Sequence, residues 1–193
     1  NTKIYWCNQV FVLDPLRELV AEKEVYGLIV LDSKEADIGL LYGKKIVPLK
    51  HLDSTVPGKS IKGGMSQGRY DRIREQAIVE FLTKVGEIAS ESFLKQPELK
   101  GIIIGGPGYI KTDLAEKEYL HYQLRAKILG VKDTGYTGEQ GFEELVRRSE
   151  DLLKEAAVMK ERQLLQKFLT ELKKGGNVVY GYTQTIEALN LGA

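Results

Sequence analysis

Residues 25–32 read VYGLIVLD, an apolar run that ends at an aspartate. An unbroken run of this length, rich in Val, Ile and Leu, is typical of a strand that is buried on both faces of a sheet. Two further strand patterns follow at 36–42 and 45–50, with Gly43 at the turn between them. The three segments therefore predict a β-meander, and we take this meander as the centre of the fold.

The residues after the meander predict an α/β domain. Apolar side chains recur at a spacing of three and four from Ile73 to Phe93, which predicts a helix of about seven turns beginning at Gln67 or Arg69. A buried strand at 100–107, a helix at about 111–129 and another strand at 131–136 follow. We expect a mixed sheet with a meander, a long helix and a protruding Gly-rich loop.

The residues beyond Gly138 predict a second and smaller unit. Helical patterns lie at 143–153 and 160–172, a strand pattern at 177–182 and a short helical pattern at 183–189. This alternation indicates an α/β sandwich, whose completeness the sequence leaves open. We place the domain boundary near residues 135–138.

Composition excludes several functional classes. The 193 residues are 42% hydrophobic and 28% charged, as in an ordinary globular protein. One cysteine (Cys7) and two histidines (His51 and His121) support neither a disulfide framework nor a conventional zinc site. We expect a cytoplasmic protein with no metal, no cofactor and no membrane span. The net charge of +1 means that a nucleic-acid partner would need a local basic patch.

A candidate basic patch lies in the loop at 51–68 and at the start of the helix that follows. The loop has no periodic apolar face and is rich in glycine, which predicts an exposed and mobile segment. Cations on such a loop can follow a phosphodiester backbone and displace its counterions. The alternative is an ordinary solvated loop. The cations, opposed only by Asp71, are Lys59, Lys62, Arg69, Arg72 and Arg74.

Two glycine-rich segments invite a phosphate-loop interpretation, and neither fits it. Residues 63–68 lack the Lys-Ser/Thr pair that closes a Walker loop. Residues 105–108, Gly-Gly-Pro-Gly, follow a strand and precede a helix, so their backbone N–H groups could hold an anion. Pro107 removes one of those donors and the dinucleotide spacing is absent, which favours a structural turn.

Several segments, taken in order along the whole chain, resemble one known family. The family is the archaeal and eukaryotic class-I peptide chain release factor, subunit 1, and the archaeal branch is the more similar. The Gly-Gly loop that runs into an Arg-rich helix makes the likeness specific. The segments are residues 1–8, 26–32, 56–59, 63–64, 69–75, 99–107 and 136–141.

The resemblance implies a division into three parts. Residues 1–24 would be the tail of the codon-reading domain, 25–135 the middle domain with the Gly-Gly loop, and 136–193 part of the C-terminal factor-binding domain. The motifs that read stop codons are not in this chain, so we expect no decoding by it alone.

The resemblance also implies a function and partners. The loop at Gly63 and Gly64 would enter the peptidyl-transferase centre and promote hydrolysis of the ester bond of peptidyl-tRNA. The partners would be large-subunit ribosomal RNA, peptidyl-tRNA and a translational GTPase. The protein would be a hydrolysis factor only with the ribosome around it.

The chain departs from the family at the loop tip, where Met65 stands in place of the family glutamine. A thioether donates no hydrogen bond and accepts only weakly, so Met65 cannot place water through its side chain. Gln67 lies two residues on, and Gly64-Met65-Ser66-Gln67 resembles the G-x-x-Q tip of a branch that releases nascent chains during ribosome quality control.

Three interpretations therefore stay open. In the first, the chain belongs to a release factor, with either the Gly-Gly-Gln tip or the G-x-x-Q tip. Gln67 is then a site residue, and the alternative is that it is an ordinary polar loop residue. The second is a non-catalytic ribosome-rescue relative of the Pelota type, which Met65 favours and the retained Gly63 and Gly64 disfavour. The third is an α/β interaction module with no RNA partner.

Overall fold

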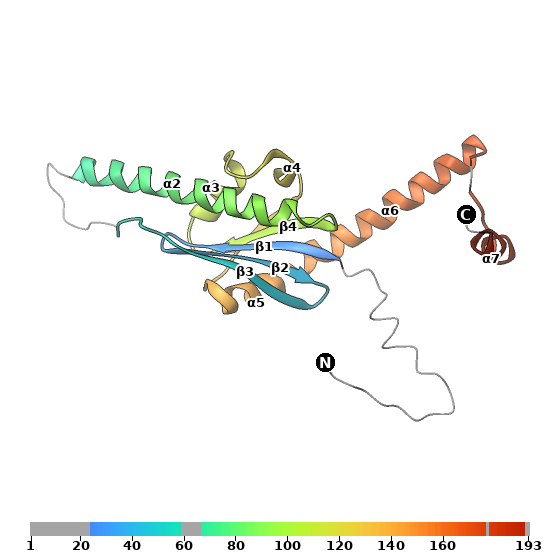
Figure 1. The fold of residues 1–193 in the computed structure, drawn as a ribbon, viewed down its shortest axis with the longest axis horizontal. Coiled ribbons are helices and arrows are strands. Elements are labelled where there is room, and N and C mark those ends of the chain that lie inside the picture. The colour runs from blue at the N-terminus through green and yellow to red at the C-terminus, as the bar shows by residue number, and fades with distance from the viewer. Residues whose placement is uncertain (1–23, 59–66, 177, 192–193) are drawn as a thin grey trace, which may run out of the picture. The chain divides into compact units, whose positions relative to one another are not determined.

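The computed structural model of the chain describes residues 24–58, 67–176 and 178–191. Its centre is a five-stranded sheet in the order β3-β2-β1-β4-β5 (Figure 1). The sheet is mixed, because β1 pairs antiparallel with β2 and parallel with β4. The strands are β1 (Val25–Leu31), β2 (Glu35–Tyr42), β3 (Lys45–Asp53), β4 (Leu99–Gly106) and β5 (Ile128–Asp133).

The predicted meander is confirmed. The strands β1, β2 and β3 are antiparallel neighbours, and the chain turns between β2 and β3 at Gly43. Every residue of β1 is buried, as its unbroken apolar sequence predicts for a central strand covered on both faces.

The long helix that follows the loop is also confirmed, as α2 (Gln67–Leu94). It lies between β3 and β4 in the chain and covers one face of the sheet (Figure 1). The side chains of Phe81, Val85 and Phe93 are buried against alternate residues of β1, including Ile29. This packing holds the C-terminal part of α2 firmly on the sheet.

The single helix predicted at 111–129 is wrong. The structure has α3 (Ile110–Glu116), α4 (Tyr122–Arg125) and then the start of β5. At 100° per residue, Leu114 and Leu120 would lie about 120° apart around one continuous helix. Both are buried in the core beside α2, so the chain leaves the helix at Lys117, whose backbone is extended.

The opposite face of the sheet is covered by α5 (Gly138–Arg148) (Figure 1). Phe142 of α5 is buried above Gly39, where a Cβ atom would come within 3.0 Å of its ring. Because α5 packs here, the compact unit that holds the sheet runs to Arg147, beyond the predicted boundary at 135–138. The assignment of 136–193 to a separate family domain stays a prediction.

The second unit is helical in the residues that the structure describes. It contains α6 (Glu150–Lys174), which includes the helix predicted at 160–172 and the end of the helix predicted at 143–153, and α7 (Tyr182–Asn190). The strand predicted at 177–182 is wrong, because 178–181 are not in a strand and residue 182 begins α7. Of the helices in the described parts of the chain, none is long and apolar enough to cross a bilayer.

Candidate functional site

The predicted site residues fall into two groups. Gln67 is the first residue of α2, and Arg69, Arg72 and Arg74 lie in the turns that follow. The remaining predicted residues lie outside the described residues: Lys59, Lys62, Gly63, Gly64 and Met65.

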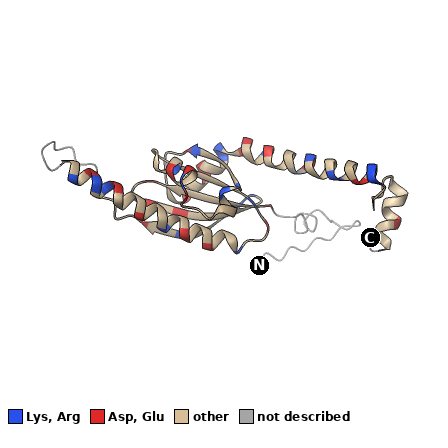
Figure 2. Ribbon diagram, turned by 90° about the horizontal axis from the view of Figure 1, so that it is seen from above, with Lys and Arg blue, Asp and Glu red and all other residues tan. Residues whose placement is uncertain are grey.

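The beginning of α2 projects past the end of the sheet (Figures 1 and 2). No residue between Gln67 and Gln76 is buried, and the first buried side chain of the helix is that of Ile78. We call residues 67–76 the head of α2. Since the rest of the helix is packed on the core, the head is a rigid extension of the domain.

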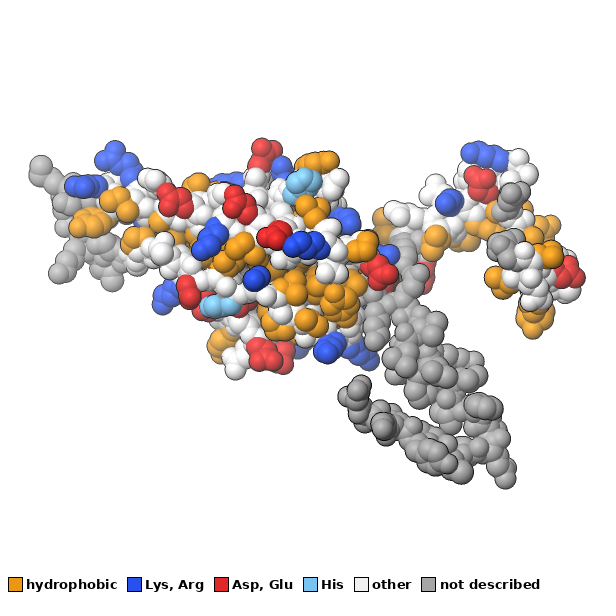
Figure 3. Space-filling view, in the orientation of Figure 1, with side chains coloured by type: hydrophobic (Ala, Val, Ile, Leu, Met, Phe, Trp, Pro, Cys, Tyr) orange, Lys and Arg blue, Asp and Glu red, His pale blue; other side chains and the backbone are white. Residues whose placement is uncertain are grey.

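The head of α2 has a net positive charge, because three arginines stand against the carboxylates of Asp71 and Glu75. Arg69 and Arg72 are exposed and Arg74 is half-buried. Among the described residues, none of the three forms an ion pair with a carboxylate, and the Nε of Arg72 donates to the Gly68 carbonyl at 3.2 Å. In Figure 2 blue segments of the ribbon, with red ones among them, lie at this end of the helix, and Figure 3 shows blue side chains there.

The helix geometry adds to this charge. The first N–H groups of a helix have no partner within the helix, and the helix dipole places partial positive charge at this end. The first turn of α2 has no acidic residue that could offset it. The head therefore combines guanidinium groups with the partial positive charge of a helix N-terminus, which together suit the phosphates of a nucleic acid.

Two apolar side chains on the head were not predicted as part of a site. Tyr70 is 58% exposed and Ile73 is 45% exposed. Their spacing continues the apolar face of α2, so sequence alone assigns Ile73 to the core. The structure leaves both in solvent because the sheet ends before the helix does.

The glycines at 105–108 have the structural role that the sequence favoured. Gly106 has a φ of +142°, and a Cβ atom on it would lie 1.8 Å from the carbonyl oxygen of Leu31. Only glycine allows the two strands to end in such close contact.

The histidines do not form a catalytic group. His51 lies in β3, and its Nδ1 is 2.7 Å from the Asp37 carboxylate, which also accepts a bond from the Gly138 N–H at 2.8 Å. The hydrogen bond and charge of Asp37 raise the pKa of His51. Through this contact β3, β2 and α5 are joined. His121 accepts a bond from the Gln123 N–H at the start of α4.

The described part of the chain contains no cluster of three or more His, Cys, Asp or Glu residues that could hold a metal ion.

Residues 25–155 match the family model described as eRF1 domain 2. Over its full length the chain is 49% identical to a peptide chain release factor subunit 1 from Thermococcus sibiricus, of which it covers 48%. Over 98% of its length it is 48% identical to the protein of the same name from Archaeoglobus fulgidus, of which it covers 47%. The chain thus spans about half the length of these curated relatives.

Solved structures agree with these sequence matches. A crystal structure of the archaeal translation termination factor aRF1 matches all of this chain, and 54% of its own, with a TM-score of 0.59 and 33% identity. A model of ribosome-bound archaeal Pelota and ABCE1 matches 94% of this chain and 49% of its own, with a TM-score of 0.60 and 25% identity.

Proposed function

The chain belongs to the eRF1 domain 2 family, and on that premise we propose that it acts in translation termination. It would bind the large ribosomal subunit and promote hydrolysis of the ester bond that joins the nascent peptide to tRNA. Residues 25–135 would supply the middle domain, 1–24 the end of a codon-reading domain and 136–193 the beginning of a factor-binding domain. This function requires a cytoplasmic location.

The exposed head of α2 is the observation that carries the proposal. Its arginines are free of carboxylates in the described residues, so they can meet RNA phosphates without first breaking an ion pair. A helix that projects past its own sheet can also enter a cavity that a flat protein surface cannot enter. Lys59 and Lys62 would extend the same positive surface along the loop.

The loop tip would supply the chemistry together with ribosomal RNA. Gly63 and Gly64 would permit a close backbone approach to RNA, and a backbone N–H at the tip, including that of Met65, would stabilise the developing oxyanion. Gln67 would orient the attacking water, because a neutral amide does so without an altered pKa. Its exposed position at the first residue of α2 leaves the amide available for this role.

A release assay on the full-length parent protein tests the role of Gln67. Ribosomes that carry labelled peptidyl-tRNA are mixed with the parent, with Gln67→Ala, or with the control Gln76→Ala from the last turn of the head. We expect Gln67→Ala to slow peptide release about 100-fold, the lower end of the contribution that one positioned catalytic group makes, and Gln76→Ala to leave it unchanged. Equal rates for all three proteins would refute the role of Gln67.

The partners follow from the same proposal. Large-subunit ribosomal RNA and peptidyl-tRNA would meet the loop and the head of α2, and a translational GTPase would deliver the factor. Hydrolysis would occur only in the ribosome, so the chain alone should not cleave peptidyl-tRNA in solution.

A second candidate is a non-catalytic ribosome-rescue factor of the Pelota type. Met65 in place of the family glutamine favours it, as does the likeness to a ribosome-bound Pelota. Restoring glutamine distinguishes the two functions. A parent protein with Met65→Gln that binds ribosomes but releases no peptide would support the rescue function, whereas release by the unaltered parent would exclude it.

A further inference from the structure

A small cavity next to the head of α2 has the chemistry of a nucleotide site. It has a volume of about 190 Å³ and lies where the parallel strands β1 and β4 end. Loops at the carboxyl ends of parallel strands are a common place for ligands. The residues that line the cavity are Asp32, Ser33, Arg74, Pro107, Gly108, Tyr109 and Ile110.

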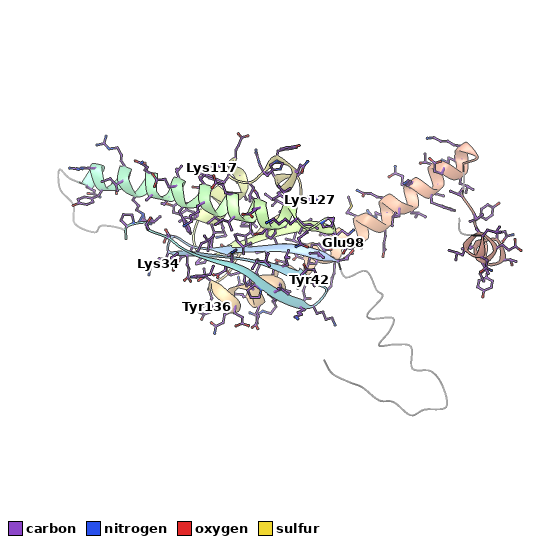
Figure 4. The ribbon with its side chains drawn as sticks, viewed as in Figure 1. Lys34, Tyr42, Glu98, Lys117, Lys127 and Tyr136 are labelled. Carbon is purple, nitrogen blue, oxygen red and sulfur yellow. The ribbon has the colours of Figure 1, made fainter. Side chains whose placement is uncertain are left out.

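The cavity lies at the end of the sheet from which α2 projects. Lys34, which follows β1, is at this end, whereas Tyr42 and Lys127 are at the other end (Figure 4). Arg74 belongs both to the cavity and to the head of α2. A ligand in the cavity would therefore lie beside anything that the head contacts.

The walls of the cavity are held in place by buried contacts. Gly106 packs directly against the carbonyl of Leu31, which fixes the ends of β4 and β1 together. The ammonium of Lys111 is buried, donates to the carbonyl of Gly108 and lies 2.6 Å from the Asp133 carboxylate. The loop that presents Tyr109 is therefore rigid enough to form a site before any ligand arrives.

The side chains around the cavity match the parts of one nucleotide. The ring of Tyr109 is 60% exposed and can stack on a base. Arg74 is a half-buried residue, and its guanidinium can bind a phosphate. The Asp32 carboxylate accepts the Lys34 N–H at Oδ1, and no other described residue donates to it, so Oδ2 can accept from a ribose hydroxyl. A carboxylate in the same cavity disfavours a purely anionic ligand such as an acidic peptide.

We propose that this cavity binds one unpaired ribonucleotide of the RNA that the head of α2 contacts. The base stacks on Tyr109, the phosphate meets Arg74 and the 2′-hydroxyl donates to Asp32. The source of the nucleotide rests on the proposed function, whereas the chemistry of the cavity does not. Unstacked bases held on aromatic side chains are the usual targets of RNA recognition.

Titration of the 193-residue chain with mononucleotides, followed by NMR, tests the site directly. We expect AMP or GMP at millimolar concentration to shift the backbone signals of Ser33, Gly108 and Tyr109 in a saturable way. Tyr109→Ala should weaken this binding about tenfold, because one base stack is typically lost with such a change. Tyr122→Ala is the matched control, since Tyr122 is 70% exposed on α4 and does not line this cavity.

Three further ligands separate the parts of the proposal. Inorganic phosphate should bind more weakly than AMP, and equal binding would overturn the stacking on Tyr109. Deoxy-AMP should also bind more weakly than AMP, and equal binding would overturn the role of Asp32. No saturable shift at Ser33, Gly108 or Tyr109 with any nucleotide would overturn the site as a whole.

Failure of this site and failure of the proposed function can be told apart. Nucleotide binding in the cavity by a parent protein that does not bind ribosomes would contradict the proposed function and support the cavity. Peptide release by a parent protein whose cavity takes no nucleotide would overturn the cavity alone.

Discussion

Neutralising the head of α2 should change how ribosome binding depends on salt. The perturbation is the double variant Arg69→Gln, Arg72→Gln. Both arginines are exposed and neither has a carboxylate partner among the described residues. The change should therefore alter the free energy of unfolding by no more than about 0.5 kcal/mol per site, as for other surface substitutions.

The expected magnitude follows from counterion release. Each phosphate neutralised by a cation contributes about 0.7 to 0.9 to the slope of log K against log salt concentration. If each arginine contacts one phosphate, the double variant should lower the absolute slope by about 1.4 to 1.8. The affinity should fall most at low salt and converge with that of the unaltered protein at high salt.

Co-sedimentation with large ribosomal subunits over a series of salt concentrations measures this slope. Lys84→Gln is the matched control, because Lys84 carries the same charge at an exposed position of α2 beyond the head. The control should keep the slope of the unaltered protein. An unchanged slope in the double variant, or an equal change in the control, would refute the placement of the RNA interface on the head.

Two other predictions concern the domain that carries the head. The pKa of His51 is raised, mainly by its hydrogen bond to Asp37 and by the charge of that residue. Protonated His51 therefore stabilises the fold below about pH 6.5, and this contribution is lost as the pH rises through the raised pKa. NMR titration should show that Asp37→Asn lowers the pKa of His51, and an unchanged pKa would exclude the contact. Gly106→Ala should lower the free energy of unfolding by more than about 2 kcal/mol, because its φ is +142° and its new Cβ would meet the Leu31 carbonyl. Gly68→Ala, whose Cβ would meet nothing, should stabilise the exposed helix or leave it unchanged, and urea denaturation of both variants measures the difference.

The elements that sequence predicts well are those whose burial is complete. Strand β1 is buried along its whole length, so its residues form an apolar run that needs no knowledge of its neighbours. The packed part of α2 is covered on one side only, and its apolar spacing is accordingly regular from Ile78 to Phe93.

The elements that sequence predicts poorly depend on distant contacts. The break between α3 and α4 exists because Leu114 and Leu120 both reach the core beside α2, and local spacing carries no sign of this. The strand expected at 177–182 has suitable residues, but the described part of the second unit offers no strand to pair with them.

The candidate site divides in the same way. Arg69, Arg72 and Arg74 are visible in the sequence because they are clustered along the chain. The exposure of Ile73 cannot be predicted from the sequence, because it depends on where the sheet ends. The cavity at Tyr109 is assembled from three separate segments, so only the fold brings Asp32, Arg74 and Tyr109 together.

Directed cleavage of ribosomal RNA locates the head of α2 on the ribosome. A cysteine is introduced as Asp71→Cys on the exposed head of α2, in a parent protein with Cys7→Ser, and carries a tethered iron chelate that cleaves nearby RNA. The same probe at Glu143→Cys on α5 serves as the control. We predict cleavage within the peptidyl-transferase centre from position 71 and not from position 143. Cleavage elsewhere on the ribosome, or none, from position 71 would contradict the account.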